Sequence, residues 1–129
     1  MMPELAFRDG VMDRIRVREP RYDEQAYLFV LSALEFCQNR LEVRRHISAA
    51  ELAHSCRDLA LERFGLMSRL VLERWGVHGT SDIGEIVFAL VELGLLVKQP
   101  ADTREEFASV FDFHEAFERD YPWGCELKA

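Results

Sequence analysis

The chain has 129 residues, of which 49% are hydrophobic and 30% are charged, the size and composition of one soluble globular domain. No unbroken apolar run is longer than that from Ile86 to Val91, which is far too short to cross a membrane. The first ten residues lack the basic and apolar regions of a signal peptide. We therefore expect a cytoplasmic protein that forms one domain over residues 1–129 and does not associate with a membrane.

The net charge of −7 belongs to the C-terminal part of the chain. Residues 1–75 contain 12 arginines and 12 acidic residues, whereas residues 76–129 contain 4 basic and 11 acidic residues. An acidic surface repels nucleic acids and other polyanions. The charge distribution therefore argues against a nucleic-acid contact through the C-terminal part.

The first half of the chain is predicted to be helical. An N-terminal helix is expected over about residues 3–15, in an arm that covers about residues 1–20. A long helix from about Asp23 to Glu42 is apolar over most of its circumference, which predicts that it is the central helix of the core. Ser48 and Glu51 form a capping-box pattern, which predicts a helix over about residues 49–64 that ends at Gly65.

The second half is predicted to combine helices with a β-hairpin. A short helix is expected over residues 67–75, followed by a helix that begins near Thr80, Ser81 or Asp82 as its cap and ends near Leu93. Strands are expected in "LLVKQ" (95–99) and "FASVFDF" (107–113). A last helix opens at a second capping-box pattern, residues 112–115, and leaves a tail at 121–129. The predicted fold class is mainly α, with a C-terminal β-hairpin.

The order of elements over about residues 66–113 resembles a winged helix-turn-helix, a fold that often reads DNA. A helix that reads DNA presents polar and basic residues to the major groove. Here the outward face of the predicted 81–93 helix carries Glu85, Phe88 and Glu92, and no basic residue. DNA binding through this helix is therefore not expected, because phosphate contacts supply much of the affinity.

The same outward face has the composition of a protein contact. Phe88 follows Gly84 by one turn and precedes Glu92 by one turn, which predicts a flat apolar patch with an acidic border. The alternative is that another part of the chain, such as the N-terminal helix, covers Phe88. The sequence favours neither of these two interpretations over the other.

Two groups of arginines are candidates for contacts to an anion or a phosphate backbone. One group is Arg14, Arg16, Arg18 and Arg21, and the other is Arg40, Arg44 and Arg45. The simpler interpretation is that these side chains pair with nearby acidic residues, namely Asp9, Asp13, Glu19, Asp23 and Glu42.

No catalytic, cofactor or metal motif is recognisable. The glycines fit neither a P-loop nor a dinucleotide fingerprint, and the three cysteines form no CxxC. Glu51 and His54 form one ExxH pattern, whereas a di-metal bundle needs two. Cys56 lies among apolar helix positions, where burial raises a thiol pKa and leaves the thiol inert. We therefore expect no cofactor and no bound metal.

Several stretches together resemble a family of small bacterial proteins that is known by a locus tag and has no assigned activity. They are "RYDEQAYLFV", "RHISAAEL", "RFGLMSRLVLERWGV", "TSDIGEIVFALVELGLL" and "FASVFDF". The whole match covers about residues 21–121. The resemblance implies a soluble single domain and supplies no catalytic or binding residue.

The leading functional hypothesis from the sequence is a non-enzymatic protein–protein interaction module, which includes a homodimer. The alternative is a nucleic-acid-binding regulator that uses the two arginine groups. An enzyme is the third hypothesis, and a pocket where His54, Glu51 or Cys56 meet would support it.

Overall fold

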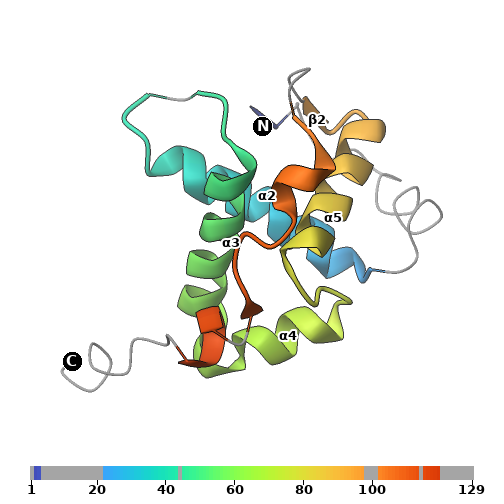
Figure 1. Cartoon of the computed structure of the whole chain (residues 1–129). Coiled ribbons are helices and arrows are strands. Elements are labelled where there is room, and N and C mark those ends of the chain that lie inside the picture. The colour runs from blue at the N-terminus through green and yellow to red at the C-terminus, as the bar shows by residue number, and fades with distance from the viewer. Residues whose placement is uncertain (1, 4–21, 44, 98–101, 114, 120–129) are drawn as a thin grey trace.

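The computed structural model describes residues 2–3, 22–43, 45–97, 102–113 and 115–119, and within them the fold is mainly helical (Figure 1). The elements in chain order are β1 (Met2–Pro3), α2 (Glu24–Asn39), α3 (Ala49–Phe64), η1 (Gly65–Met67), α4 (Ser68–Arg74), α5 (Thr80–Glu92), β2 (Leu96–Val97), η2 (Arg104–Phe107) and η3 (Glu115–Arg119). The mainly α class is thus confirmed. No helix among these residues is long and apolar enough to cross a membrane.

Helix α2 is the central helix of the core, as its sequence predicts. It packs against α3, α5 and β1, and its buried residues cover about half of its circumference. The Asp23 side chain caps it by accepting a hydrogen bond from the Gln25 amide. The Asp23 amide donates to the Trp75 carbonyl at 3.0 Å, which fixes the start of α2 to the end of α4. The helix ends at Asn39, before the predicted end at Glu42.

Helix α3 has the predicted bounds and the predicted capping box. The Glu51 amide donates to Ser48 Oγ at 3.2 Å, and the Ser48 amide donates to Glu51 Oε1 at 3.1 Å. Gly65 ends the helix with a φ of 54°, a left-handed conformation that glycine adopts at little cost. The buried Ser68 hydroxyl hydrogen-bonds the Ala60 and Gly65 carbonyls, and this contact turns the chain from α3 into α4.

Helix α5 buries the predicted face but is not capped as predicted. Ile83, Ile86, Val87 and Leu90 are all buried, while Gly79 is the N-cap and supplies no side-chain hydrogen bond. Two of the three residues proposed as caps, Thr80 and Asp82, form other hydrogen bonds instead. Asp82 accepts hydrogen bonds from the Tyr22 hydroxyl at 2.6 Å and the His78 amide at 2.9 Å, and Thr80 Oγ1 accepts from the Val110 amide at 3.1 Å.

The predicted C-terminal β-hairpin is wrong. Strand β2 is short, and it pairs antiparallel with β1, with Met2 opposite Val97 and Pro3 opposite Leu96. Residues 104–107 form the 3₁₀ helix η2, and none of the described residues 102–113 is in a strand. In Figure 1 this segment runs from η2 between α3 and α5 to η3 beside the end of α3.

The phenylalanines of this segment explain why it is not a strand. Phe107 is fully buried against α5. A Cβ atom added to Gly84 of α5 would lie only 2.8 Å from the Cβ of Phe107. Phe113 is also buried, and its ring lies edge-on to that of Phe117 with the centroids 5.0 Å apart. These aromatic side chains fill separate places in the helical core instead of lining one face of a sheet.

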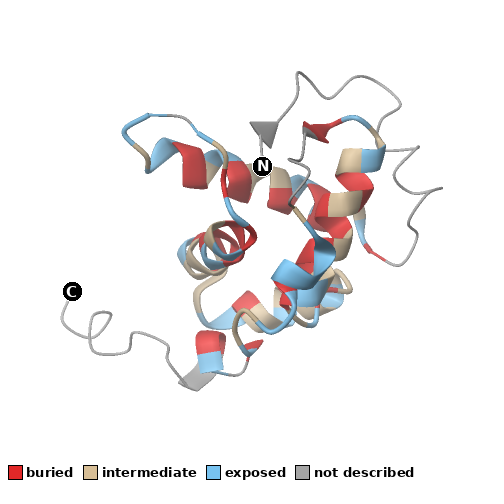
Figure 2. Cartoon of the chain, turned by 45° about the horizontal axis from the view of Figure 1, so that its top comes forward, coloured by how far each residue is buried: buried red, intermediate tan, exposed pale blue. Residues whose placement is uncertain are grey.

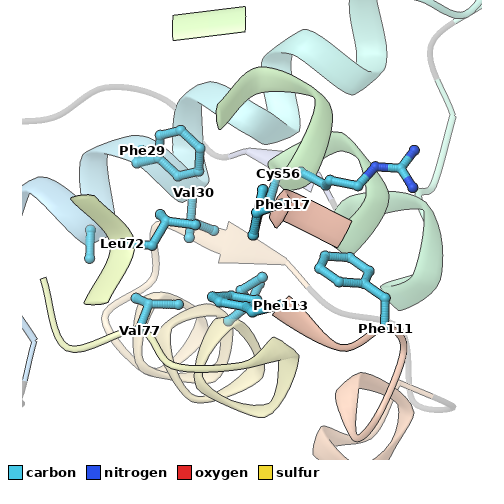
Figure 3. A pocket seen from close by; sticks show the side chains of 11 residues that line it. Phe29, Val30, Cys56, Leu72, Val77, Phe111, Phe113 and Phe117 are labelled. Carbon is cyan, nitrogen blue, oxygen red and sulfur yellow. The ribbon is translucent and has the colours of Figure 1, made fainter. Parts of the chain in front are cut away.

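The core is closely packed around α2, α3 and α5. Figure 2 shows buried positions gathered on the inward sides of these helices. In Figure 3, side chains from α2, α3, α4 and the C-terminal segment point toward one another around a cavity of about 10 Å³. This volume holds about one water molecule, so the cavity is a packing gap in the core and not a ligand site.

The remaining two predicted helices are the N-terminal helix and the last helix. The predicted N-terminal helix lies outside the described residues except for Pro3, which belongs to β1. The predicted last helix is the five-residue η3, Glu115–Arg119. Asp112 Oδ1 accepts a hydrogen bond from the Glu115 amide at 3.2 Å, as the capping-box pattern of residues 112–115 predicts.

Replacing Gly84 by Ala is expected to lower the free energy of unfolding by about 1 kcal/mol. The added methyl group would overlap the buried Phe107 side chain, and overpacking of this kind typically costs about 1–3 kcal/mol, against a gain of about 1 kcal/mol in helix propensity. Urea unfolding measures the difference. The control is Ser81→Ala on the exposed face of the same helix, which should change stability by less than about 0.5 kcal/mol. A Gly84→Ala protein as stable as the wild type would contradict this packing.

Candidate functional site

A groove lies between the end of α2 and the first half of α3. Its volume is about 390 Å³, in the range of small-molecule sites. Glu51, His54, Ser55 and Asp58 line it from α3 because their spacing of three and four residues places them on one helix face. The rest of its lining is Cys37, Arg40, Leu41 and Ala50.

The connection between α2 and α3, residues 40–48, is held by the buried side chain of Gln38. Gln38 is only 1% exposed. Its Nε2 donates to the Arg45 carbonyl at 2.6 Å, and its Oε1 accepts from the Arg45 amide at 3.2 Å. Figure 1 shows that the connection projects from the helical body, and the clamp to Gln38 holds its returning end at the end of α2.

Arg45 in turn reaches the start of α3. Its Nη2 and Nη1 donate to the two Glu51 carboxylate oxygens at 2.6 and 3.1 Å, a bidentate ion pair. These hydrogen bonds from Arg45, together with the one from the Ser48 amide, lower the pKa of Glu51 from 4.5 to about 2. Glu51 is therefore an ionised structural group at one end of the groove.

A second ion pair crosses the groove at its other end. Arg40 Nη1 on α2's C-terminal side lies 2.9 Å from Asp58 Oδ2 on α3, and Arg57 Nη2 lies 2.9 Å from Asp58 Oδ1. Burial alone would raise the pKa of Asp58, but hydrogen bonds from Arg40 and Arg57 outweigh burial and lower it. The groove is thus bounded by two carboxylates that are both already paired with arginines.

Three further side chains line the groove between these ion pairs. The Cys37 thiol is buried and lies 4.0 Å from the Glu51 carbonyl oxygen, to which it donates. Ser55 is buried, whereas His54 is exposed, and the His54 ring lies 5.4 Å from the Phe111 ring, centroid to centroid. The hydrogen bonds of Gln38 and the position of Ser55 beside His54 in the groove were not predicted from the sequence.

The arginine groups are only partly described. Arg14, Arg16, Arg18, Arg21 and Arg44 lie outside the described residues. Arg40 and Arg45 are paired with acidic residues, as the simpler interpretation has it, but the partners differ from those predicted. They are Asp58 and Glu51 of α3, while the predicted partner Asp23 caps α2.

The predicted face of Glu85, Phe88 and Glu92 lies on α5 and is partly covered. Phe88 is half-buried and packs against the core. The Arg104 guanidinium from η2 lies 5.5 Å from the centre of the Phe88 ring, and its Nη2 lies 3.7 Å from Glu92 Oε1. An intramolecular cation therefore occupies part of the patch that the sequence offers as a protein contact.

A different apolar surface is more exposed. Leu66, Met67 and Leu70 of η1 and α4 are 57%, 52% and 49% exposed, and we call them the α4 face. Leu72, on the opposite side of α4, is buried in the core. The sequence prediction of a helix over residues 67–75 did not separate these two sides, because apolar residues occur on both.

Neither metal binding nor cysteine catalysis is supported among the described residues. No cluster of three or more His, Cys, Asp or Glu side chains there could hold a metal ion. Glu51 and His54 do line one groove, but Glu51 is engaged by Arg45 and Ser48. Cys56 is 1% exposed. The pKa of its thiol is strongly raised, mainly because the thiol is buried and also because of the charge of Cys37. This outcome agrees with the predicted inert thiol.

No protein-family model, curated protein or solved structure matches this chain. The resemblance to a family of small bacterial proteins and the winged-helix resemblance therefore stay predictions, and the function rests on the chemistry of the surfaces described above.

The ion pair of Glu51 predicts a pH dependence of stability. Because the folded-state pKa is lowered to about 2, the ionised carboxylate stabilises the fold above its ordinary pKa of 4.5, and this contribution is lost as the pH falls toward 2. The side chain is 36% exposed, and after allowance for solvent screening we expect a contribution of about 1 kcal/mol.

Replacing Glu51 by Gln removes the charge and keeps an oxygen for the capping box. Compared with wild type, urea unfolding should show a loss of about 1 kcal/mol near neutral pH that largely disappears near pH 2. Glu62→Gln, at an exposed position of α3, is the control and should show no such trend. A loss that is the same at both pH values would mean that the ion pair does not stabilise the fold.

Proposed function

We propose that the protein is a non-enzymatic protein–protein interaction module and that the α4 face is its contact surface. The observation that carries this proposal is the clustering of exposed apolar side chains. Of the five large hydrophobic residues that are exposed in the described part of the chain, Leu66, Met67 and Leu70 lie within five positions. Clustered exposed apolar side chains mark binding surfaces, whereas scattered ones need no explanation.

The charges around the α4 face indicate the chemistry of the partner. Arg63 and Arg74 are exposed and have no ion-pair partner among the described residues. Arg69 is paired with Glu73 at 3.2 Å, and Glu62 is exposed. Within residues 62–74, three arginines stand against two glutamates. We propose as partner an amphipathic segment of another protein, with apolar anchors flanked by carboxylates.

The acidic face of Glu85, Phe88 and Glu92 is a second, weaker candidate contact. Its motivation is the half-buried aromatic ring between two acidic residues. A second copy of this chain could use that face against the α4 face, and this arrangement would be a homodimer or a larger assembly. Light scattering in solution measures this self-association directly.

The test of the proposal is selection of binding peptides from a random library displayed on phage, with the full chain as bait. We expect enrichment of sequences that have apolar residues at helical spacing and flanking Asp or Glu. Synthetic peptides from this set should bind the Leu66→Ser/Leu70→Ser protein at least about tenfold more weakly, because each buried leucine contributes about 1.5–3 kcal/mol.

Val43→Ser is the matched control, because Val43 is 76% exposed and lies in the α2–α3 connection, which the proposed surface does not include. It should leave peptide affinity unchanged. Enrichment of basic or entirely polar peptides, or equal binding to the Leu66→Ser/Leu70→Ser protein, would contradict the α4 face as the contact surface.

A further inference from the structure

The groove between α2 and α3 contains hydrogen-bond donors that the fold does not use. The Arg40 guanidinium has five N–H donors, and its ion pair with Asp58 uses Nη1. The only other interaction of the Arg40 guanidinium within the described residues is its position 5.0 Å from the centre of the Phe36 ring. Arg40 is half-exposed, so its remaining donors are available at the groove.

His54 and Ser55 add two more groups on the facing helix. Neither side chain forms a hydrogen bond with the described residues, and both line the groove. Ser55 is buried apart from its contact with the groove. A buried hydroxyl without a hydrogen-bond partner is costly. In the described part of the chain, every side-chain oxygen or nitrogen that is fully buried has a hydrogen-bond partner. The hydroxyl of Ser55 is therefore satisfied from the groove.

The two carboxylates of the groove are both engaged by arginines. Arg40 lines the groove together with Glu51 and Asp58, and Arg45 and Arg57 pair with these carboxylates from outside the lining. Both carboxylates are already neutralised by these arginines, so a cation would find no unpaired acidic group there. An anion would find the spare donors of Arg40 together with His54 and Ser55.

We propose that this groove binds the anionic group, a phosphate or a carboxylate, of a small molecule, with Arg40, His54 and Ser55 as its donors. The volume of about 390 Å³ is in the range of sites for small molecules. The Gln38 clamp and the Arg45–Glu51 ion pair form the site before any ligand arrives, which reduces the entropic cost of binding. This site is independent of the α4 face.

The test is titration of the isotopically labelled full chain with inorganic phosphate and, separately, with citrate, at constant ionic strength. Chemical shifts of the amides should change saturably at residues 37–58, with a dissociation constant of about 1 mM or lower, as expected for a few charge-assisted hydrogen bonds. Saturation by phosphate alone identifies a phosphate site, and saturation by citrate alone identifies a carboxylate site. Saturation by both identifies a general site for anions.

Two variants and one control locate the binding. Arg40→Gln should weaken binding at least about tenfold, and Ser55→Ala, which leaves the Arg40–Asp58 ion pair intact, about threefold or more. Arg63→Gln is the control, because Arg63 is an exposed arginine of α3 that lies outside the groove. It should change the affinity less than twofold, because Arg63 does not contact the ligand. Shifts that do not saturate, or an equal effect of Arg63→Gln and Ser55→Ala, would overturn the proposal.

Discussion

The paired hydrogen bonds between the Gln38 side chain and the backbone of Arg45 are the constraint on which the α2–α3 region depends. A buried amide must satisfy both its donor and its acceptor, and at Gln38 the same loop residue satisfies both. The clamp brings the Arg45 guanidinium to Glu51 at the start of α3. The ion pair and the wall of the groove therefore depend on one uncharged side chain, while the α4 face lies on a separate part of the fold.

Much of the helical fold could be predicted from the sequence, because local rules decide it. The capping box at Ser48 and the left-handed Gly65 fix the bounds of α3 without tertiary information. The C-terminal segment could not be predicted in the same way. Its alternating aromatic residues satisfy the pattern of a strand, but Phe107 packs where α5 has Gly84 and no Cβ. That close approach is a tertiary contact, and neither residue alone signals it.

The site was less predictable than the fold, for two physical reasons. Gln38 follows Leu34 by one helical turn, so it lies on the apolar face of α2. A polar residue at such a position signals a buried hydrogen bond, although its partner cannot be read from the sequence. The arginines were recognised as anion contacts or ion-pair partners, but Arg40 and Arg45 pair with Asp58 and Glu51, which come close to them only after α3 folds against α2. Exposure of Leu70 likewise depends on which side of α4 meets the core.

Hydrogen exchange at the Arg45 amide tests the central role of Gln38 most directly. In the wild type this amide donates to a buried oxygen, so it should exchange at least about tenfold more slowly than in an unstructured peptide. In Gln38→Met, which keeps the length of the side chain and removes both hydrogen bonds, that protection should be lost while the amides of α5 stay protected. An unprotected Arg45 amide in the wild type, or full protection in the variant, would contradict the account.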